Sequence, residues 1–247
     1  RKYQSAFPSG YQALVSPRYA LKDSLHLERL TTPNNQSISL LKPYQETAHY
    51  RLHFYSQQER FLDDYIPVLE NMHLRVMDQV QFPVTVDGVT QFIRSFTIKT
   101  ASSQCASLNS VSASLLETIQ AIMNGKIEND ALNKLLVLTG MAWQEIDVIR
   151  AYRNYYLQLG YRTTRATVHH ALINNPRVVL CLFNYFEARF RLNPEWDDPA
   201  QREEQALFPL RLQLLESMVP VSDINDDKIL RTLFNLIDAT MRFTFPL

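Results

Sequence analysis

The chain has 247 residues, of which 46% are hydrophobic and 20% are charged, which is typical of a globular protein large enough for one large or two smaller domains. Lys+Arg and Asp+Glu both number 25, so the basic excess of a nucleic-acid-binding protein is lacking. No apolar run approaches the ~20 residues of a membrane helix, and no charged-then-apolar leader opens the chain. We therefore expect a cytoplasmic protein that binds neither nucleic acid nor membrane.

The cysteine and glycine content excludes two further kinds of site. Cys105 and Cys181 are too few for a disulfide framework and have no metal-ligand spacing, so we expect reduced packing residues. The five glycines, at positions 10, 88, 125, 140 and 160, are dispersed. A dinucleotide fingerprint or a P-loop needs clustered glycines, so that backbone N–H groups can approach a phosphate. We therefore expect no dinucleotide site. Arg1, in place of an initiating methionine, indicates a fragment of a longer polypeptide.

Up to about residue 104 the pattern predicts helices and strands in the order helix, strand, strand, helix, strand, strand. Ser16 and Pro17 open the first helix, because serine caps helices and proline is tolerated in the first turn. The helices are expected over residues 16–30 and from 63 or 64 to 71, and the strands over 37–42, 49–55, 74–86 and 90–99.

Asp87-Gly88 lies between the last two strands and predicts a hairpin, since both central residues of a type I′ turn need positive φ. Pro83 should place its strand at a sheet edge or mark a bulge. The order of elements favours an antiparallel sheet with helices on one face, close to a ferredoxin-like arrangement.

Near residue 105 the spacing of hydrophobic residues changes from alternating to helical. The polar stretch at 101–114 spans this change and could serve as a linker. Helices are expected over residues 115–124, 131–138, 143–159, 164–174, 176–190, 200–218 and 226–243. The predicted fold class is α+β: a ferredoxin-like antiparallel sheet module at 1–104, followed by an all-α helical domain at 105–247.

The helix at 143–159 has the most distinctive pattern. Its apolar and aromatic residues recur at three- and four-residue steps and predict a buried stripe: Val148, Ile149, Tyr152, Tyr155, Tyr156 and Leu159. Such aromatics favour a core over a ligand platform. Arg150 lies on the remaining surface, where its fork-shaped guanidinium is suited to an acid across a domain interface.

Carboxylate pairs and histidines offer little evidence for chemistry. The pairs Asp63-Asp64, Asp197-Asp198 and Asp226-Asp227 stand at predicted helix starts, which favours capping over acid–base catalysis. His49 and His53 are roughly 13 Å apart along a strand. His169 and His170 point in different directions on a helix. We therefore expect no metal site.

Several stretches resemble the large, single-chain class of bacterial NAD-specific glutamate dehydrogenases. Residues 127–133 (IENDALN) and 138–143 (LTGMAW) resemble the entry into that family's aromatic helix, which 143–160 (WQEIDVIRAYRNYYLQLG) resembles in turn. Residues 182–190 (LFNYFEARF) are similar to its next helix end, and 226–233 (DDKILRTL) with 239–242 (ATMR) to the segment before its catalytic region. Residues 69–76 (LENMHLRV) resemble its last regulatory ACT-like module.

The resemblance implies a parent enzyme that oxidatively deaminates L-glutamate to 2-oxoglutarate and ammonia with NAD. It implies a non-catalytic N-terminal regulatory and assembly region here, with no catalytic, cofactor-binding or metal residue and no cofactor of its own. The implied partners are the catalytic region of the same polypeptide, further copies in a homo-oligomer, and a possible small-molecule effector. The alternatives are a free-standing amino-acid-sensing ACT-like module and a structural helical scaffold.

The helix at 226–243 leads, by this resemblance, towards the catalytic region. Its stripe through Leu230, Leu233, Phe234, Ile237 and Met241 can pack on preceding helices. Arg231 and Arg242 remain on other faces. We therefore take Arg150, Arg231 and Arg242 as candidate interdomain contacts.

Overall fold

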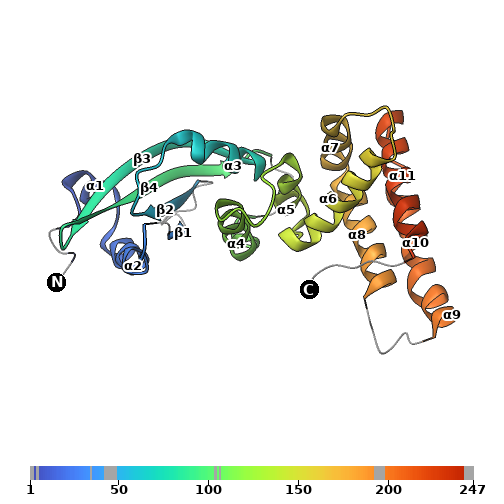
Figure 1. Ribbon diagram of the computed structural model, residues 1–247, viewed down its shortest axis with the longest axis horizontal. Coiled ribbons are helices and arrows are strands. Elements are labelled where there is room, and N and C mark those ends of the chain that lie inside the picture. The colour runs from blue at the N-terminus through green and yellow to red at the C-terminus, as the bar shows by residue number, and fades with distance from the viewer. Residues whose placement is uncertain are drawn as a thin grey trace. The chain divides into compact units, whose positions relative to one another are not determined.

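The computed structural model describes residue 3 and residues 6–33, 35–41, 49–102, 105, 107–191 and 198–241. The chain divides into two compact units, Arg1–Asp130 and Ala131–Leu247 (Figure 1). We describe each unit by itself.

The first unit contains a four-stranded sheet and several short helices. Its elements in chain order are α1 Ser9–Leu14, α2 Pro17–Glu28, β1 Gln36–Leu41, β2 Tyr50–Ser56, the 3-10 turn Leu62–Asp64, α3 Ile66–Asn71, β3 Leu74–Val86, β4 Val89–Thr100 and α4 Ser112–Met123.

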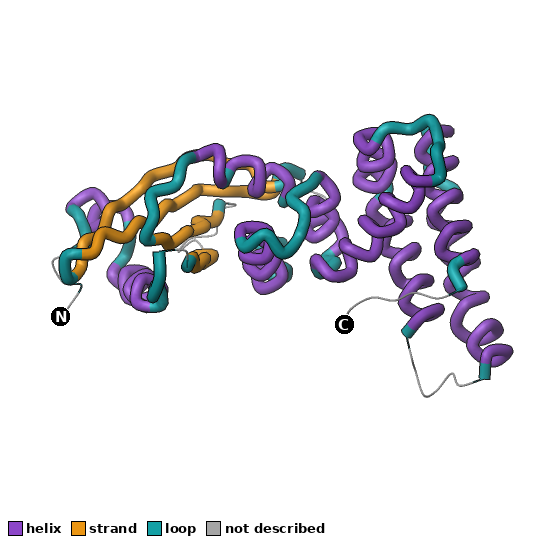
Figure 2. The backbone as a smooth tube through the Cα atoms, in the orientation of Figure 1, coloured by secondary structure: helices purple, strands orange, loops and turns teal. Residues whose placement is uncertain are grey.

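The strand order is β1-β2-β4-β3, and every neighbouring pair is antiparallel. Figure 2 shows the strands of this sheet in orange. Asp87 and Gly88 link β3 to β4 with φ of 52° and 78°, as a type I′ turn requires. β3 is an edge strand. Pro83 has no backbone N–H to donate, but no strand lies on the outer side of β3 to accept such a hydrogen bond. The predicted strands, the hairpin and the position of Pro83 are confirmed.

Helices cover both faces of the sheet, whereas the sequence predicted one covered face. Successive residues of a strand point to opposite faces. On β2, Tyr55 points to Asp23 of α2, while the ring of Phe54 lies 4.6 Å from that of Tyr65, which precedes α3. Residues Leu52–Tyr55 are all buried. Burial on both faces is typical of a strand that is covered on its two sides.

The division between the units follows Asp130, because α4 packs on β1 and so belongs with the sheet. The sequence placed α4 in the helical domain, on the strength of the polar stretch at 101–114. That stretch connects two parts of the same unit.

The second unit is helical. Its elements are the 3-10 turn Ala131–Asn133, α5 Lys134–Thr139, α6 Trp143–Gln158, α7 Arg165–Asn174, α8 Pro176–Phe190, α9 Pro199–Arg202, the π-helical turn Glu203–Leu207, α10 Phe208–Met218 and α11 Ile224–Ala239. These elements lie where helices were predicted, with two differences: the helix expected over 200–218 is interrupted by the π-helical turn, and the one expected over 226–243 ends at Ala239. The α+β class, an ACT-like antiparallel sheet followed by a helical region, is thereby confirmed.

The buried face of α6 is rotated relative to the predicted stripe. Tyr152 and Tyr156 are buried, but Tyr155 and Leu159 are each 46% exposed, and Arg153, which lies outside the predicted stripe, has no exposed surface. The reason is that α6 packs against α5, α7, α8 and α11, which bury a wide sector of it. Arg153 donates to His169 of α7 within that sector.

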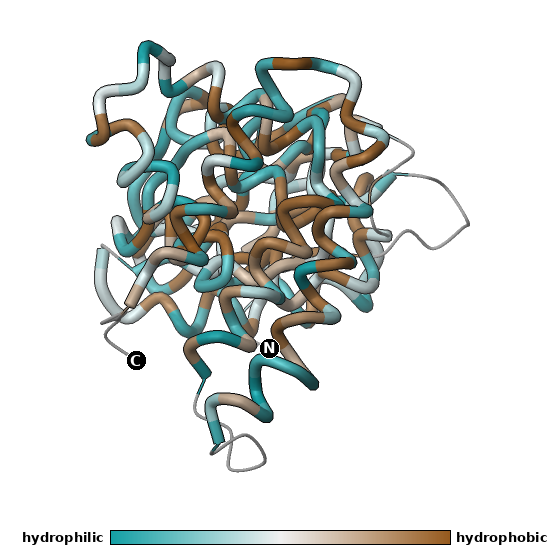
Figure 3. Tube along the Cα trace, turned by 90° about the vertical axis from the view of Figure 1, so that its right-hand side faces the viewer, coloured by the Kyte–Doolittle hydropathy of each residue, from teal (hydrophilic) through white to brown (hydrophobic). Residues whose placement is uncertain are grey.

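Hydrophobic and hydrophilic residues alternate along the Cα trace, as the colouring in Figure 3 shows. Leu230, Leu233 and Ile237 of α11 are buried as predicted. Met241, which was assigned to the same stripe, lies beyond the end of α11 and is 97% exposed. No helix within the described ranges is long and apolar enough to cross a membrane.

Candidate functional site

A buried polar cluster in the first unit joins α1 and α2 to the sheet. At its centre is Asp23 of α2, a carboxylate with no exposed surface. Tyr55 of β2 donates its hydroxyl to Asp23 Oδ1 at 2.5 Å, and Tyr11 of α1 donates to Oδ2. His53 Nδ1 lies 3.3 Å from Oδ1. One carboxylate of α2 thus holds side chains from α1 and β2.

The cluster extends along the same sheet face through short contacts. The Tyr55 hydroxyl also lies 2.7 Å from Ser39 Oγ on β1. The ring of His26 stacks on that of Tyr55, with 4.7 Å between the centroids, and its Nδ1 lies 2.6 Å from Ser37 Oγ. The helical segment and both strands β1 and β2 are therefore tied together by polar groups rather than by apolar packing alone.

Opposing effects set the protonation of these groups. Burial on its own raises the pKa of the Asp23 carboxyl. The hydrogen bond and charge of His53 and the hydrogen bonds from Tyr11 and Tyr55 lower it by more, so the pKa of Asp23 lies below its usual value. Burial and the neighbouring carboxylate raise the pKa of both tyrosines. Burial, followed by the charge of Arg29, lowers the pKa of His26. At neutral pH, Asp23 is therefore ionised and the tyrosines are neutral donors.

The geometry fits a structural link better than catalysis. A carboxylate beside a histidine is an arrangement used for general base catalysis, but the base must reach a substrate. Asp23 and His53 have no exposed surface. His53 Nε2 has no hydrogen-bond partner within the described part of the chain. We conclude that the cluster fixes the helices on the sheet.

The sequence reasoning missed this cluster. It weighed His53 only against His49, which is exposed, as a metal pair. One signal was present: Asp23, Leu27 and Leu30 follow the spacing of a buried helical face, and an acid on such a face requires buried partners.

An open groove of about 800 Å³ lies beside the cluster, between α1 and α2. Its floor includes buried Tyr11, whose ring stacks on Phe7 at 4.4 Å, and one wall includes Leu21 and Leu25, which are 67% and 50% exposed. The groove is lined by Tyr3, Phe7, Tyr11, Gln12, Val15, Pro17, Ala20, Leu21, Ser24, Leu25 and Glu28.

The three candidate interdomain arginines differ in their surroundings. Arg150 is buried, pairs with Asp147 one turn earlier and donates to Asn133 Oδ1 at 2.8 Å, all inside the helical unit. Little of its surface is left for another domain. Arg231 is half-exposed, and its Nε lies 2.8 and 2.9 Å from the two carboxylate oxygens of Asp227. Arg242 lies outside the described residues.

The carboxylate pairs stand at helix starts. Asp64 accepts from the Phe61 N–H at 3.0 Å, and Asp198 caps α9 through the Ala200 N–H. Asp197 lies outside the described residues. Asp226 and Asp227 occupy the first turn of α11.

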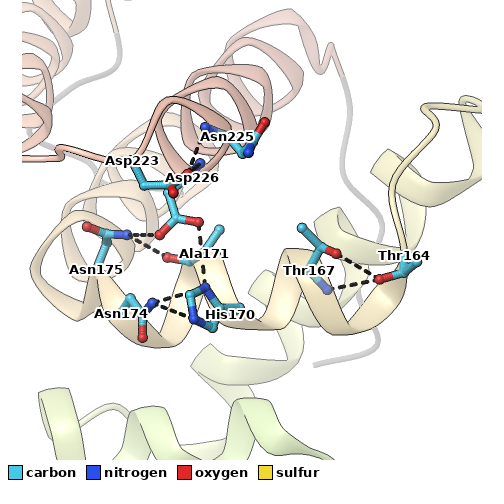
Figure 4. Close-up of polar contacts among 9 residues, drawn as sticks. All are labelled: Thr164, Thr167, His170, Ala171, Asn174, Asn175, Asp223, Asn225 and Asp226. Atoms are coloured by element: carbon cyan, nitrogen blue, oxygen red, sulfur yellow. Dashed lines mark hydrogen bonds and ion pairs between the residues drawn. The ribbon is translucent and has the colours of Figure 1, made fainter.

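The cap of α11 is Asp223, three residues before the predicted start, and it accepts from the Asn225 and Asp226 N–H groups at 2.8 and 2.9 Å (Figure 4). Asp226 instead turns towards α7, where Asn175 donates to it at 3.1 Å and His170 lies 3.8 Å away. This group joins α11 to the end of α7. Across the residues that the structure describes, no three His, Cys, Asp or Glu side chains are grouped to hold a metal ion.

Family comparisons divide the chain into three consecutive segments. Residues 1–30 match the model of glutamate dehydrogenase helical motif 2, residues 36–111 that of the glutamate dehydrogenase ACT3 domain, and residues 127–192 that of glutamate dehydrogenase helical motif 3. The first segment carries α1 and α2, and the second carries the whole sheet. The Asp23 cluster thus links helical motif 2 to the ACT3 domain.

Curated relatives match nearly the entire chain. It is 27% identical to the NAD-specific glutamate dehydrogenases of Halomonas elongata and Pseudomonas aeruginosa, over 99% and 98% of its length. It is 26% identical to that of Mycobacterium tuberculosis, over 98%. In each case the chain spans 15% of the relative's length.

The matches follow one another in a single order, and the fold contains the antiparallel sheet and the helices that they describe. The resemblance drawn from the sequence is therefore confirmed. The chain belongs to the family of large NAD-specific glutamate dehydrogenases, of which it carries helical motif 2, the ACT3 domain and helical motif 3.

Proposed function

We propose that the chain is a non-catalytic regulatory and assembly segment of an NAD-specific glutamate dehydrogenase. The parent converts L-glutamate, NAD and water to 2-oxoglutarate, ammonia and NADH. The observation that carries the proposal is the ordered match of three segments to regions of one family. The site geometry supports it, because Asp23 and His53, the carboxylate and histidine of the cluster, have no exposed surface at which a substrate could react.

The further parts of the proposal concern the parent protein. NAD serves the parent and has no site in this chain. The catalytic region of the same polypeptide is the principal partner, and the parent acts as a homo-oligomer in the cytoplasm. Arg231 and Arg242 stay proposed interdomain contacts. Arg150 is the weakest of the three, since its guanidinium is engaged inside the helical unit.

One second function is favoured by a specific observation. Residues 36–111 match an ACT3 domain, which supports binding of a small amino-acid effector at the sheet module. Calorimetric titration of the chain with individual amino acids tests this function. Saturable heat with one amino acid supports sensing, whereas its absence across the set leaves the assembly role or a structural scaffold.

The direct experiment compares the full-length polypeptide with a version that lacks residues 1–247. We expect the intact protein to form NADH from glutamate, and the truncated one to change in cooperativity, oligomeric state or turnover. Steady-state kinetics and light scattering measure these properties. If all three are unchanged, the chain has no regulatory or assembly role.

A further inference from the structure

The groove between α1 and α2 has the features of a helix-binding surface. α2 has two apolar faces. One carries Asp23 and Leu27 and is covered by the sheet. The other carries Leu21 and Leu25, which are four residues apart and so lie one above the other on the helix. The second face remains exposed although both leucines are large and apolar.

The groove is held in shape by the buried cluster beneath it. Tyr11 lies in its floor, and the Tyr11 hydroxyl is fixed by the ionised Asp23. The stacked ring of Phe7, which precedes α1, continues this floor. A preformed apolar surface loses less side-chain entropy when it binds a partner than a mobile surface does.

A single charged side chain at one end of the groove can fix the orientation of a bound helix. Among the described residues that line it, Glu28 at the C-terminal end of α2 is the one charged side chain. A helix whose lysine or arginine reaches Glu28 would bind in one orientation. α2 has 12 residues and is roughly 18 Å long, which corresponds to about three turns of a partner helix.

The size of the groove favours a tethered partner. A stable interface between separate proteins uses about 20–30 residues on each side, and 11 of the residues that the structure describes line the groove. A segment of the same polypeptide needs less surface, because the linker supplies a high effective concentration. The chain spans 15% of the length of its relatives, so most of such a polypeptide lies elsewhere in its sequence.

We propose, on the basis of the proposed function, that this groove receives an amphipathic helix from another part of the same polypeptide. The helix presents aliphatic side chains at i, i+4 and i+7 to Leu21 and Leu25, and a lysine or arginine to Glu28. This contact joins helical motif 2 to the remainder of the enzyme, and through the Asp23 cluster it reaches the ACT3 sheet.

Photo-crosslinking in the full-length polypeptide tests the proposal. p-Benzoylphenylalanine is placed at Leu21, at Leu25 or, as a control, at Lys22, which is exposed on α2 but does not line the groove. We expect cross-links from both leucine positions to one helical segment outside this chain, with a yield several-fold above that from Lys22. Equal yields at all three positions, or no cross-link, would overturn the proposal.

Two further arms identify the occupant. A mixture of isotopically light and heavy copies separates cross-links within one polypeptide from those between copies, and predominantly mixed products would overturn the proposal in favour of a second copy. Glu28→Lys should lower the yield at Leu25 several-fold, while Glu28→Gln should lower it less. An unchanged yield in Glu28→Lys would overturn the assigned basic contact.

The same samples separate this proposal from the function on which it rests. Glutamate-dependent NADH formation is measured on each full-length preparation. Active protein without groove cross-links overturns the groove proposal alone. Cross-links within an intact polypeptide that cannot oxidise glutamate overturn the proposed function, and the helix contact stands.

Discussion

Asp23 is a carboxylate with no exposed surface that accepts hydrogen bonds from the hydroxyls of Tyr11 and Tyr55 and lies beside His53. Taking a charge out of water is costly, and this cost is offset only while the partners are in place. The cluster therefore makes the docking of α1 and α2 on the sheet depend on a few polar side chains.

Removal of the central carboxylate should be more harmful than removal of one donor. Asp23→Ala leaves several buried donors without an acceptor, and we expect it to lower the free energy of unfolding by about 3–5 kcal/mol. Tyr55→Phe removes one hydrogen bond to a charged group and should cost about 1.5–3 kcal/mol. Urea unfolding measures both. A loss below about 1 kcal/mol for Asp23→Ala would contradict the assigned role.

The lowered pKa of Asp23 predicts how stability depends on pH. The folded state releases the proton more readily than the unfolded chain, whose aspartates titrate near ~3.9. The stabilisation is thus present above that value and is lost as pH falls through the folded-state pKa. Asp23→Asn should flatten the acid limb of a stability–pH curve, while Asp63→Asn, at an exposed site, should not. Parallel acid limbs for the Asp23→Asn protein and the parent chain would refute this.

The two adjacent tyrosines of α6 provide a matched pair for testing its buried face. Tyr156 is buried and Tyr155 is 46% exposed. Tyr156→Ala should therefore cost about 3–5 kcal/mol in urea unfolding, as for other large buried rings. Tyr155→Ala should cost less, because Tyr155 keeps 46% of its surface exposed after folding. Equal losses in the two variants would mean that the orientation of α6 is wrong.

At the scale of elements, the sequence predicted those turns and helix caps that depend only on residues close together in the chain. The turn at Asp87 and Gly88 needs two positive φ values, and Thr164 caps α7 by accepting from the Thr167 N–H at 3.1 Å, both within a few residues. The Asp23–His53 contact joins residues 30 positions apart, and no local spacing encodes it. α1 was also missed, since six residues give too short a periodic pattern.

The orientation of α6 could not be predicted for a related reason. Periodicity identifies an apolar stripe, but the buried sector depends on how many helices surround the element. Arg153 is fully buried because α7 supplies His169, and the identity of that neighbour is a tertiary property. The element was predicted correctly and its environment was not.

α11 leads to a prediction about communication with the parent enzyme. Arg231 pairs with Asp227 four residues earlier and is 49% exposed, so the local pair should contribute only a few tenths of a kcal/mol. The hydrogen bond to Asp227 raises the pKa of Arg231, which stays charged. We expect Arg231→Glu to leave the melting temperature of the chain nearly unchanged. In the full-length enzyme it should alter cooperativity, assembly or turnover.

Kinetics and light scattering of the full-length Arg231→Glu protein decide between an interdomain contact and a local pair. Lys228→Glu, on the same helix, is the matched control for a change of charge. If the Arg231 variant behaves like the starting enzyme, Arg231 serves only its own helix. Arg242 can be treated in the same way.

At the scale of the whole molecule, the chain combines a sheet unit and a helical unit that match successive regions of one enzyme family. Composition excluded a clustered-glycine nucleotide site, and the order of elements predicted the antiparallel sheet. The C-terminal boundary of the sheet unit was not predictable from the sequence. The contact of α4 with β1 places that boundary at Asp130, beyond the polar stretch at 101–114. We propose that a fragment ending near residue 104 is less stable than one ending at Asp130.

The measurement that tests the central claim most directly is glutamate-dependent NADH formation by two purified proteins, the chain alone and the full-length polypeptide that contains it. The account predicts turnover by the full-length protein and a signal at the buffer level for the chain, because we propose that the chain is a regulatory and assembly segment of the parent. Turnover by the chain alone, or an intact polypeptide that does not oxidise glutamate, would contradict it.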